Sequence, residues 1–246
     1  MKTFFAQACC ALFFLGFGFA DLSVVEAKGA AKVRMQSGLE AFRQSDYQTA
    51  RNIFARLRRD IPKWTLPKLY WAMSQFYVDP SDDELLRILR DVARAMPANP
   101  RGHIFLGRLF LQRGEPKNAA QALSIAALLR PQRSDLHFWL GRAYEDSQQV
   151  ELAIKAYETA GRLRKKDATV LLALAGLYEQ EKRFGDAEKA LLEMISFQPK
   201  IVYHRRRLAQ FYLRTQREDE AKEVFRVIDT LDPRTRRKMR SLKPSR

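Results

Sequence analysis

The sequence predicts an all-α fold, a solenoid of antiparallel helix hairpins, and three observations support this prediction. Similar residues recur every 34 positions over four copies within a chain of 246 residues. Inside each copy, apolar residues are spaced three and four apart, as on one face of a helix. Glycine and proline are scarce, at 11 and 10 residues, which disfavours an all-β chain full of tight turns. A solenoid repeats one supersecondary unit and buries apolar surface between neighbouring units.

Four copies of the repeat keep the same residue types in the same columns. An alanine after a polar turn recurs every 34 residues, at Ala119, Ala153, Ala187 and Ala221. Twelve residues earlier is a small residue, preceded by leucine and followed three positions later by an aromatic residue; the small residues are Gly107, Gly141, Ala175 and Ala209. The leucine and the aromatic residue share one helical face, and the small residue lets the partner helix approach closely. Proline, which stops a helix, ends all but one copy, at Pro131, Pro199 and Pro233, and Lys165 replaces it in the other.

Two weaker copies precede these four. The first has matching residues at Gly38, Ala41, Ala50, Phe54, Leu57 and Pro62, with Ser37 in place of the leucine. The second has Ala72, Phe76, Leu89 and Pro97, with Met73 at the small position and Leu85 at the alanine position. One extra residue separates the two copies.

These columns resemble the tetratricopeptide repeat, a helix–turn–helix of 34 residues. The resemblance implies a right-handed superhelical solenoid whose first helices line a concave side. We expect a signal segment at 1–27, a basic tail at 236–246, and six repeats at 31–64, 66–99, 100–133, 134–167, 168–201 and 202–235. The alternative, a pentatricopeptide array that reads RNA one base per repeat, has a period of 35 and fits the constant spacing less well.

The first residues are typical of a secretory signal. Met1 and Lys2 precede an apolar run that ends in small residues near Ala20. Cleavage fits after Ala20 or after Ala27, and we prefer Ala27 because a polar region then precedes the cut. The mature chain is expected to start near Lys28 and to be periplasmic or envelope-associated. The alternative is an uncleaved membrane anchor, since residues 3–20 approach the minimum spanning length of ~17–20 residues.

Both cysteines, Cys9 and Cys10, lie inside the apolar run, so a processed chain would carry no thiol. The formal net charge of +16 favours acidic partners or anionic surfaces. Near the C-terminus, basic residues are expected either to attach the chain to an anionic membrane surface or cell-wall polymer, or to act as a solubilising end. The residues of this electrostatic tail are Arg234, Arg236, Arg237, Lys238 and Arg240.

No pattern predicts catalysis. His103 and His137 recur at one repeat position and are interpreted as packing residues, because no third ligand recurs with them and zinc normally needs three or four. The chain has no glycine-rich phosphate loop and no nucleophile motif. We therefore expect no enzyme activity, cofactor, metal or small-molecule substrate. Export would also disfavour nucleic acid as a partner.

The concave face is the candidate site. Residues at i, i+4 and i+7 of the first helices should point into it. They predict an aromatic start, two arginines stacked from neighbouring repeats, an acidic stretch at Glu145 and Glu179, and a basic end. Aromatic residues and arginine dominate interface energetics. The predicted groove residues are Tyr70, Ser74, Tyr77, Arg108, Phe138, Arg142 and Arg206.

These features are consistent with two functions. One is a scaffold or assembly factor of the bacterial cell envelope that binds a protein or peptide in the groove; in architecture the chain resembles the pilotins of type IV pili. The other is a cationic module that binds an anionic membrane surface or cell-wall polymer. Salt dependence would separate them, because exposed charges are screened at high ionic strength.

Overall fold

The computed structural model describes residues 19–232, all of whose regular elements are α-helices. The helices fall into two compact units, divided between Gln112 and Arg113, and each unit is described by itself. The division falls inside the third expected repeat. The expected basic tail and most of the expected signal segment lie outside the described residues.

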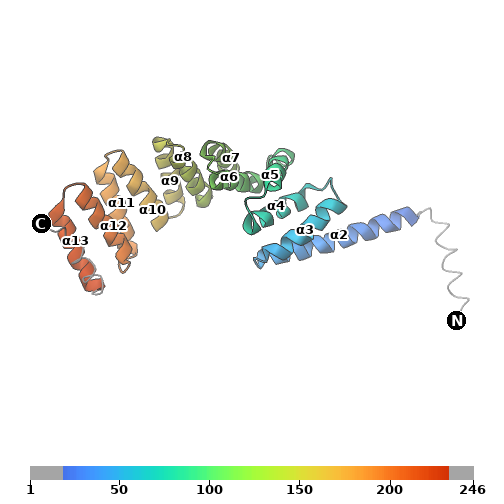
Figure 1. The fold of residues 1–246 in the computed structure, drawn as a ribbon, viewed down its shortest axis with the longest axis horizontal. Coiled ribbons are helices and arrows are strands. Elements are labelled where there is room, and N and C mark those ends of the chain that lie inside the picture. Colours follow the sequence, from blue (N-terminus) through green and yellow to red (C-terminus); the bar gives the residue numbers. More distant parts are fainter. Residues whose placement is uncertain (1–18, 233–246) are drawn as a thin grey trace, which may run out of the picture. The chain divides into compact units, whose positions relative to one another are not determined.

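The N-terminal unit contains five helices among its described residues (Figure 1): α2 (Phe19–Arg43), α3 (Tyr47–Asp60), α4 (Thr65–Val78), α5 (Asp83–Ala95) and α6 (Pro100–Gln112). Each helix packs against the next one in the chain, and α4 also packs against α6. The core between them is formed by Phe54, Leu57, Leu69, Leu85, Leu89 and Leu109, all fully buried. These residues recur at the three- and four-residue spacing that predicted helices.

Helix α2 is longer than the first helix of the expected repeat. It begins at Phe19 and runs without interruption through Ala27 and Lys28, the expected cleavage point. Cleavage there would therefore cut within a helix of the full-length chain. No described helix is both long enough and apolar enough to cross a membrane.

The C-terminal unit contains seven helices among its described residues: α7 (Pro116–Leu129), α8 (Ser134–Asp146), α9 (Val150–Leu163), α10 (Ala168–Gln180), α11 (Phe184–Phe197), α12 (Val202–Arg214) and α13 (Glu218–Leu231). Consecutive helices pack against each other throughout. The repeated alanines, Ala153, Ala187 and Ala221, are each fully buried. Their small size is what lets paired helices lie close together.

The turn inside each hairpin has one recurring conformation. A residue with positive φ stands one position before the next helix cap, at Ser45, Gly114, Gln148, Lys182 and Gln216. A left-handed residue at this place turns its own N–H and the next one back to the last free carbonyls of the helix. For example, Gln148 N–H donates to the Glu145 carbonyl at 3.0 Å and Gln149 N–H to the Tyr144 carbonyl at 2.8 Å. The second hairpin differs, because Ser81, which stands before the cap Asp82, has no positive φ. Its turn is held by Asp79, whose Oδ1 accepts from the Ser81 backbone N–H at 3.0 Å.

Candidate functional site

Aromatic side chains gather on one face of the N-terminal unit. We call this the aromatic face and define it by Phe42, Tyr47, Tyr70 and Tyr77. Tyr47 and Tyr77 are stacked with ring centroids 4.3 Å apart and planes 19° from parallel, and the Phe42 ring meets Tyr47 edge-on at 5.3 Å. Phe42 also lies 5.8 Å from Tyr70. Three helices, α2, α3 and α4, therefore contribute to a single aromatic surface.

Two arginines of α6 extend this surface. Arg108 lies over the Phe76 ring at 4.7 Å from its centroid, and its Nη1 donates to the Tyr77 hydroxyl at 3.3 Å. Arg101 Nη1 donates to the Tyr70 hydroxyl at 2.7 Å. Cation–π contacts of this kind hold a guanidinium in place beside the rings. The face thus combines flat apolar rings with hydrogen-bond donors.

Two of the three residues predicted in α4 lie on this face. Tyr77 is 43% exposed, and Tyr70 is half-buried. The prediction for Ser74 is wrong: its side chain is fully buried, and its hydroxyl donates to the Tyr70 carbonyl at 2.8 Å. A short side chain at this position is satisfied by its own helix and does not reach the surface.

Phe42 and Tyr47 were not predicted as site residues. Phe42 occupies in the first copy the place that Tyr77 occupies in the second, 35 positions on, once the extra residue between the copies is counted. Extending the same column by one repeat would have found it. Tyr47 begins the second helix of its hairpin, and no column of first-helix residues points to it.

The other predicted groove residues lie in the C-terminal unit. Phe138 is half-buried against the core, with its ring 5.6 Å from that of Tyr157. Arg142 is exposed and lies 3.9 Å from Asp146 one turn on, and Arg206 is exposed. Since Arg108 belongs to the N-terminal unit, its expected stacking on Arg142 stays a prediction.

The predicted acidic stretch is not free to meet a ligand. Glu179 accepts two hydrogen bonds from the Arg214 guanidinium, from Nε at 2.9 Å and Nη2 at 2.7 Å. Glu145 accepts from the Tyr157 hydroxyl at 2.7 Å. Both carboxylates are therefore structural partners within the repeat array, which corrects their interpretation as groove charges.

The recurring histidines link successive repeats. His103 Nε2 lies 3.1 Å from the Pro97 carbonyl, and His137 Nε2 lies 2.8 Å from the Pro131 carbonyl. Arg205, at the same repeat position, donates to the Pro199 carbonyl. The fifth repeat has Leu171 there and follows the copy that lacks the proline. Within the described chain, no group of three or more His, Cys, Asp or Glu side chains could hold a metal ion.

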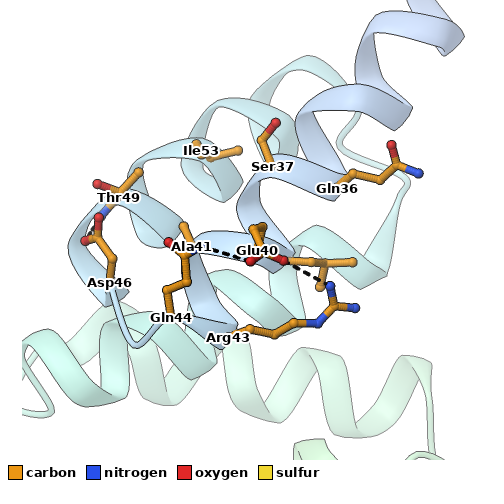
Figure 2. Close-up of a pocket in the computed structure, with 10 residues that line it drawn as sticks. Gln36, Ser37, Glu40, Ala41, Arg43, Gln44, Asp46, Thr49 and Ile53 are labelled. Atoms are coloured by element: carbon orange, nitrogen blue, oxygen red, sulfur yellow. Dashed lines mark hydrogen bonds and ion pairs between the residues drawn. The ribbon is translucent and has the colours of Figure 1, made fainter.

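A separate hollow of about 860 Å³ lies beside the first hairpin, between α2 and the start of α3 (Figure 2). Its polar groups mostly bind one another. Glu40 accepts from Gln44 at 2.9 Å and from Arg43 at 3.3 Å, and Asp46 caps α3 by accepting from the Thr49 backbone N–H at 3.1 Å. This arrangement stabilises the turn and offers no set of converging groups for a ligand.

The helix hairpins with a 34-residue period define a helical repeat protein. The sequence pattern of the tetratricopeptide repeat family matches residues 105–163 and 140–200. Solved structures agree with this assignment. The crystal structure of MamA has a TM-score of 0.60 and 21% identity, over 67% of this chain and 96% of MamA. YrrB, described as a TPR protein with an unusual peptide-binding site, has a TM-score of 0.63 and 14% identity, over 73% of this chain and 92% of YrrB.

A tetratricopeptide repeat protein from Parabacteroides merdae ATCC 43184 is also similar, with a TM-score of 0.66 and 14% identity, over 82% of this chain and 80% of the other. No curated protein matches the sequence. Residues 105–200 therefore match the tetratricopeptide repeat family, and the described helices have the fold of tetratricopeptide repeat proteins.

Proposed function

We propose that this protein is a non-catalytic scaffold that binds an extended segment of a protein partner on the aromatic face. The observation that carries the proposal is the exposed Tyr77 ring, which is stacked on Tyr47 and bound by Arg108. A tyrosine held on both sides loses little conformational entropy when a ligand packs on it. The Tyr77 side chain is therefore pre-organised for binding in the absence of a partner.

The chemistry of the face suits a peptide with an apolar side chain next to free oxygen acceptors. The rings of Tyr47 and Tyr77 offer apolar surface, and tyrosine and arginine are the residue types enriched at binding hot spots. Arg101, which is exposed, offers guanidinium donors to backbone carbonyls or carboxylates of the bound segment. The peptide-binding site described for YrrB gives a precedent within the same fold.

A randomised peptide library displayed on phage tests this proposal without knowledge of the partner. Peptides selected on the parent protein are synthesised, and their affinities are measured by titration calorimetry. We expect Tyr77→Ala to weaken binding by more than ~2 kcal/mol, the range of a hot spot. Arg108→Ala is expected to weaken it as well.

The matched control is Tyr203→Ala, which removes another exposed tyrosine from the C-terminal unit. Its peptide affinity should equal that of the parent, and circular dichroism should show the same helix content for all variants. Selected peptides that bind Tyr77→Ala as tightly as the parent would place the site elsewhere.

We further propose that the protein works in the bacterial cell envelope. The support for this proposal comes from the N-terminal sequence pattern alone. Residues 1–18 lie outside the described residues. Fractionation and intact-mass measurement of the native protein should find a chain starting near Lys28 outside the cytoplasm; full-length protein in the cytosol would contradict export. A role in assembling a pilus or secretion complex is the narrower form of this proposal, and it requires a partner that belongs to such a complex.

The basic tail supports a second candidate, attachment to an anionic membrane surface or cell-wall polymer. Residues 233–246 hold seven lysines and arginines and no acidic residue, which is seven of the net sixteen positive charges. Attachment of this kind should weaken steeply as salt rises, whereas peptide binding on the aromatic face should persist.

A further inference from the structure

The turns between repeats in the C-terminal unit share one edge of the helix stack. In a stack of antiparallel hairpins, every turn that leads from one repeat to the next lies on the same side. Three such turns, at 130–133, 164–167 and 198–201, separate α7 from α8, α9 from α10, and α11 from α12. We call this the inter-repeat edge and define it by exposed residues: Arg130, Lys165, Lys166, Lys200, Ile201 and Tyr203.

The inter-repeat edge carries positive charge that is not neutralised locally. Within the described residues, the ammonium groups of Lys165, Lys166 and Lys200 form no ion pair with a carboxylate. Asp167, the nearest acidic residue in sequence, accepts from the Thr169 backbone N–H at 3.0 Å and caps α10. Its other oxygen, Oδ2, lies 3.8 Å from the Arg164 guanidinium. Asp167 is therefore paired with the helix end and with Arg164, and the three lysines are exposed.

Lys165 and Lys166 are not the residues that the repeat pattern favours at these two positions. The neighbouring copies have proline at the position of Lys165. Lys166 adopts a positive φ of 63°, a conformation that favours glycine or asparagine over lysine. Glycine or asparagine at 166 would fit the backbone better, so the local fold does not explain why two lysines are adjacent here.

Apolar side chains stand beside these lysines. Ile201 is 46% exposed and occupies the N-cap of α12, where it makes no side-chain cap hydrogen bond. Isoleucine is among the poorest N-cap residues, and the preceding repeat has Asp167 at this position. Tyr203, two residues on, is 51% exposed. Ile201 thus supplies no side-chain cap to α12 and leaves much of its apolar side chain in water.

We propose that the inter-repeat edge docks on an anionic lipid bilayer. The lysines bind lipid phosphates, while Ile201 and Tyr203 enter the boundary between head groups and acyl chains. Tyrosine is enriched at that boundary, and basic residues beside apolar ones are typical of surfaces that lie on a membrane. A soluble anionic polymer would satisfy the lysines but would leave the isoleucine in water. The bilayer therefore accounts for both halves of the surface.

This inference goes beyond the proposed peptide site, which uses residues of the other unit. It is tested by flotation of the full chain with vesicles of phosphatidylglycerol mixed with phosphatidylcholine. Binding to vesicles of phosphatidylcholine alone is measured in parallel and subtracted, so that any contribution of the apolar N-terminal residues is removed.

Reversing two charges tests the lysines. Lys165→Glu with Lys200→Glu should weaken vesicle binding by at least ~10-fold, given the usual contribution of each basic residue near an anionic surface. The matched control is Lys155→Glu with Lys189→Glu, two exposed lysines on the second helices α9 and α11. The control makes the same change in net charge and should retain most of the binding. Equal loss in the two double variants would overturn the proposal, because net charge alone would then explain attachment.

Replacing the isoleucine separates membrane contact from a structural role. Ile201→Ser introduces a preferred N-cap residue, so its melting temperature should be equal to or above that of the parent while vesicle binding falls. Leu128→Ser, at an exposed position of α7, is the control and should bind like the parent. Unchanged binding by Ile201→Ser overturns the proposal. The proposal is also overturned if the tail variant Arg236→Ala/Arg237→Ala/Lys238→Ala loses all binding while the edge variants lose none. Binding of the protein to polyphosphate but not to vesicles would overturn it as well.

Discussion

The ring of Tyr157 lies directly over Gly141, so that a Cβ atom added at Gly141 would stand 2.7 Å from the ring carbon Cδ1. Cγ and Cε1 of the same ring would lie within 2.9 Å. Tyr157 is fully buried, and its hydroxyl is fixed to Glu145. The ring therefore has little freedom to move away. The first hairpin repeats the relationship, with Phe54 at 2.7 Å from a Cβ on Gly38.

Gly141→Leu is therefore expected to destabilise the protein by ~1–3 kcal/mol through overpacking. Gly176→Ala is the control, because a Cβ there meets no atom within 4 Å and the residue is exposed in α10. That change should stabilise the helix by ~0.5–1 kcal/mol. Urea denaturation followed by circular dichroism measures both effects. A variant at Gly141 as stable as the parent would show that the small-residue column does not mark close packing.

The sequence alone predicted the helix hairpins, because the repeated columns encode their packing. Ala153 and Ala187 recur since each is fully buried between paired helices. The left-handed turn residues were not predicted, because Gln148 and Lys182 carry no signal for positive φ. The left-handed conformation is seen to recur only when the hairpins are compared in three dimensions.

The candidate site was predicted less completely, and the reason is side-chain length and pairing. Ser74 and Arg108 are 34 residues apart and lie on the same face of their helices, so the sequence places them at equivalent positions. Only the arginine side chain is long enough to reach the surface. Glu179 was predicted as a groove charge, and the sequence gives no indication that Arg214, in the next repeat, binds it. Pairing between repeats depends on the rotation from one hairpin to the next, which composition and spacing do not fix.

One column of the first helices holds Tyr144, Tyr178 and Tyr212, and each hydroxyl hydrogen-bonds a side chain of the preceding helix, with a different partner in each repeat. The Tyr178 hydroxyl donates to Glu158 at 2.8 Å, whereas Tyr144 lies 3.3 Å from the Ser124 hydroxyl. Bonds to charged acceptors contribute more than bonds between neutral groups. Tyr178→Phe should therefore cost ~1–2 kcal/mol and Tyr144→Phe ~0.5–1 kcal/mol, by urea denaturation. The reverse order would contradict this account.

The same bond predicts how stability depends on alkaline pH. Burial, together with the hydrogen bond to Glu158, raises the pKa of Tyr178 from 10.0 to about 12. The folded state thus keeps its proton where the unfolded state loses it, so this contribution is fully present below pH 10.0 and is lost as pH rises to about 12. Absorbance titration of the tyrosinate at alkaline pH should lose a late-titrating group in Tyr178→Phe. An unchanged titration curve would contradict the raised pKa.

Arg214 binds Glu179 through two nitrogens and links the fifth repeat to the sixth. The Glu179 side chain is 17% exposed and that of Arg214 is 48% exposed, so solvent screens part of the interaction. A double-mutant cycle with Glu179→Gln and Arg214→Gln should give a coupling energy of ~1 kcal/mol, at the upper end for exposed pairs because the geometry is bidentate. A coupling energy of zero would mean that solvent cancels the attraction.

The contacts of Glu188 predict how the stability of the folded protein changes at acidic pH. Its carboxylate accepts from Arg217 Nη1 at 2.6 Å and from the Tyr212 hydroxyl at 2.6 Å. The hydrogen bond from Arg217, and then that from Tyr212, outweigh burial and lower the pKa of Glu188 below 4.5. A depressed pKa in the folded state contributes stability that is present above pH 4.5 and is lost as pH falls through the folded value.

Glu188→Gln should therefore be less stable than the parent at pH 7 by ~1–2 kcal/mol, since Arg217 loses a charged partner. Its stability should fall less steeply than that of the parent below pH 4.5. Glu193→Gln, an exposed glutamate on the same helix, is the control and should follow the parent curve. Urea denaturation at a series of pH values measures all three proteins. If the curve of Glu188→Gln has the same acid slope as the parent, the link between α11 and the sixth hairpin is not the source of the acid sensitivity.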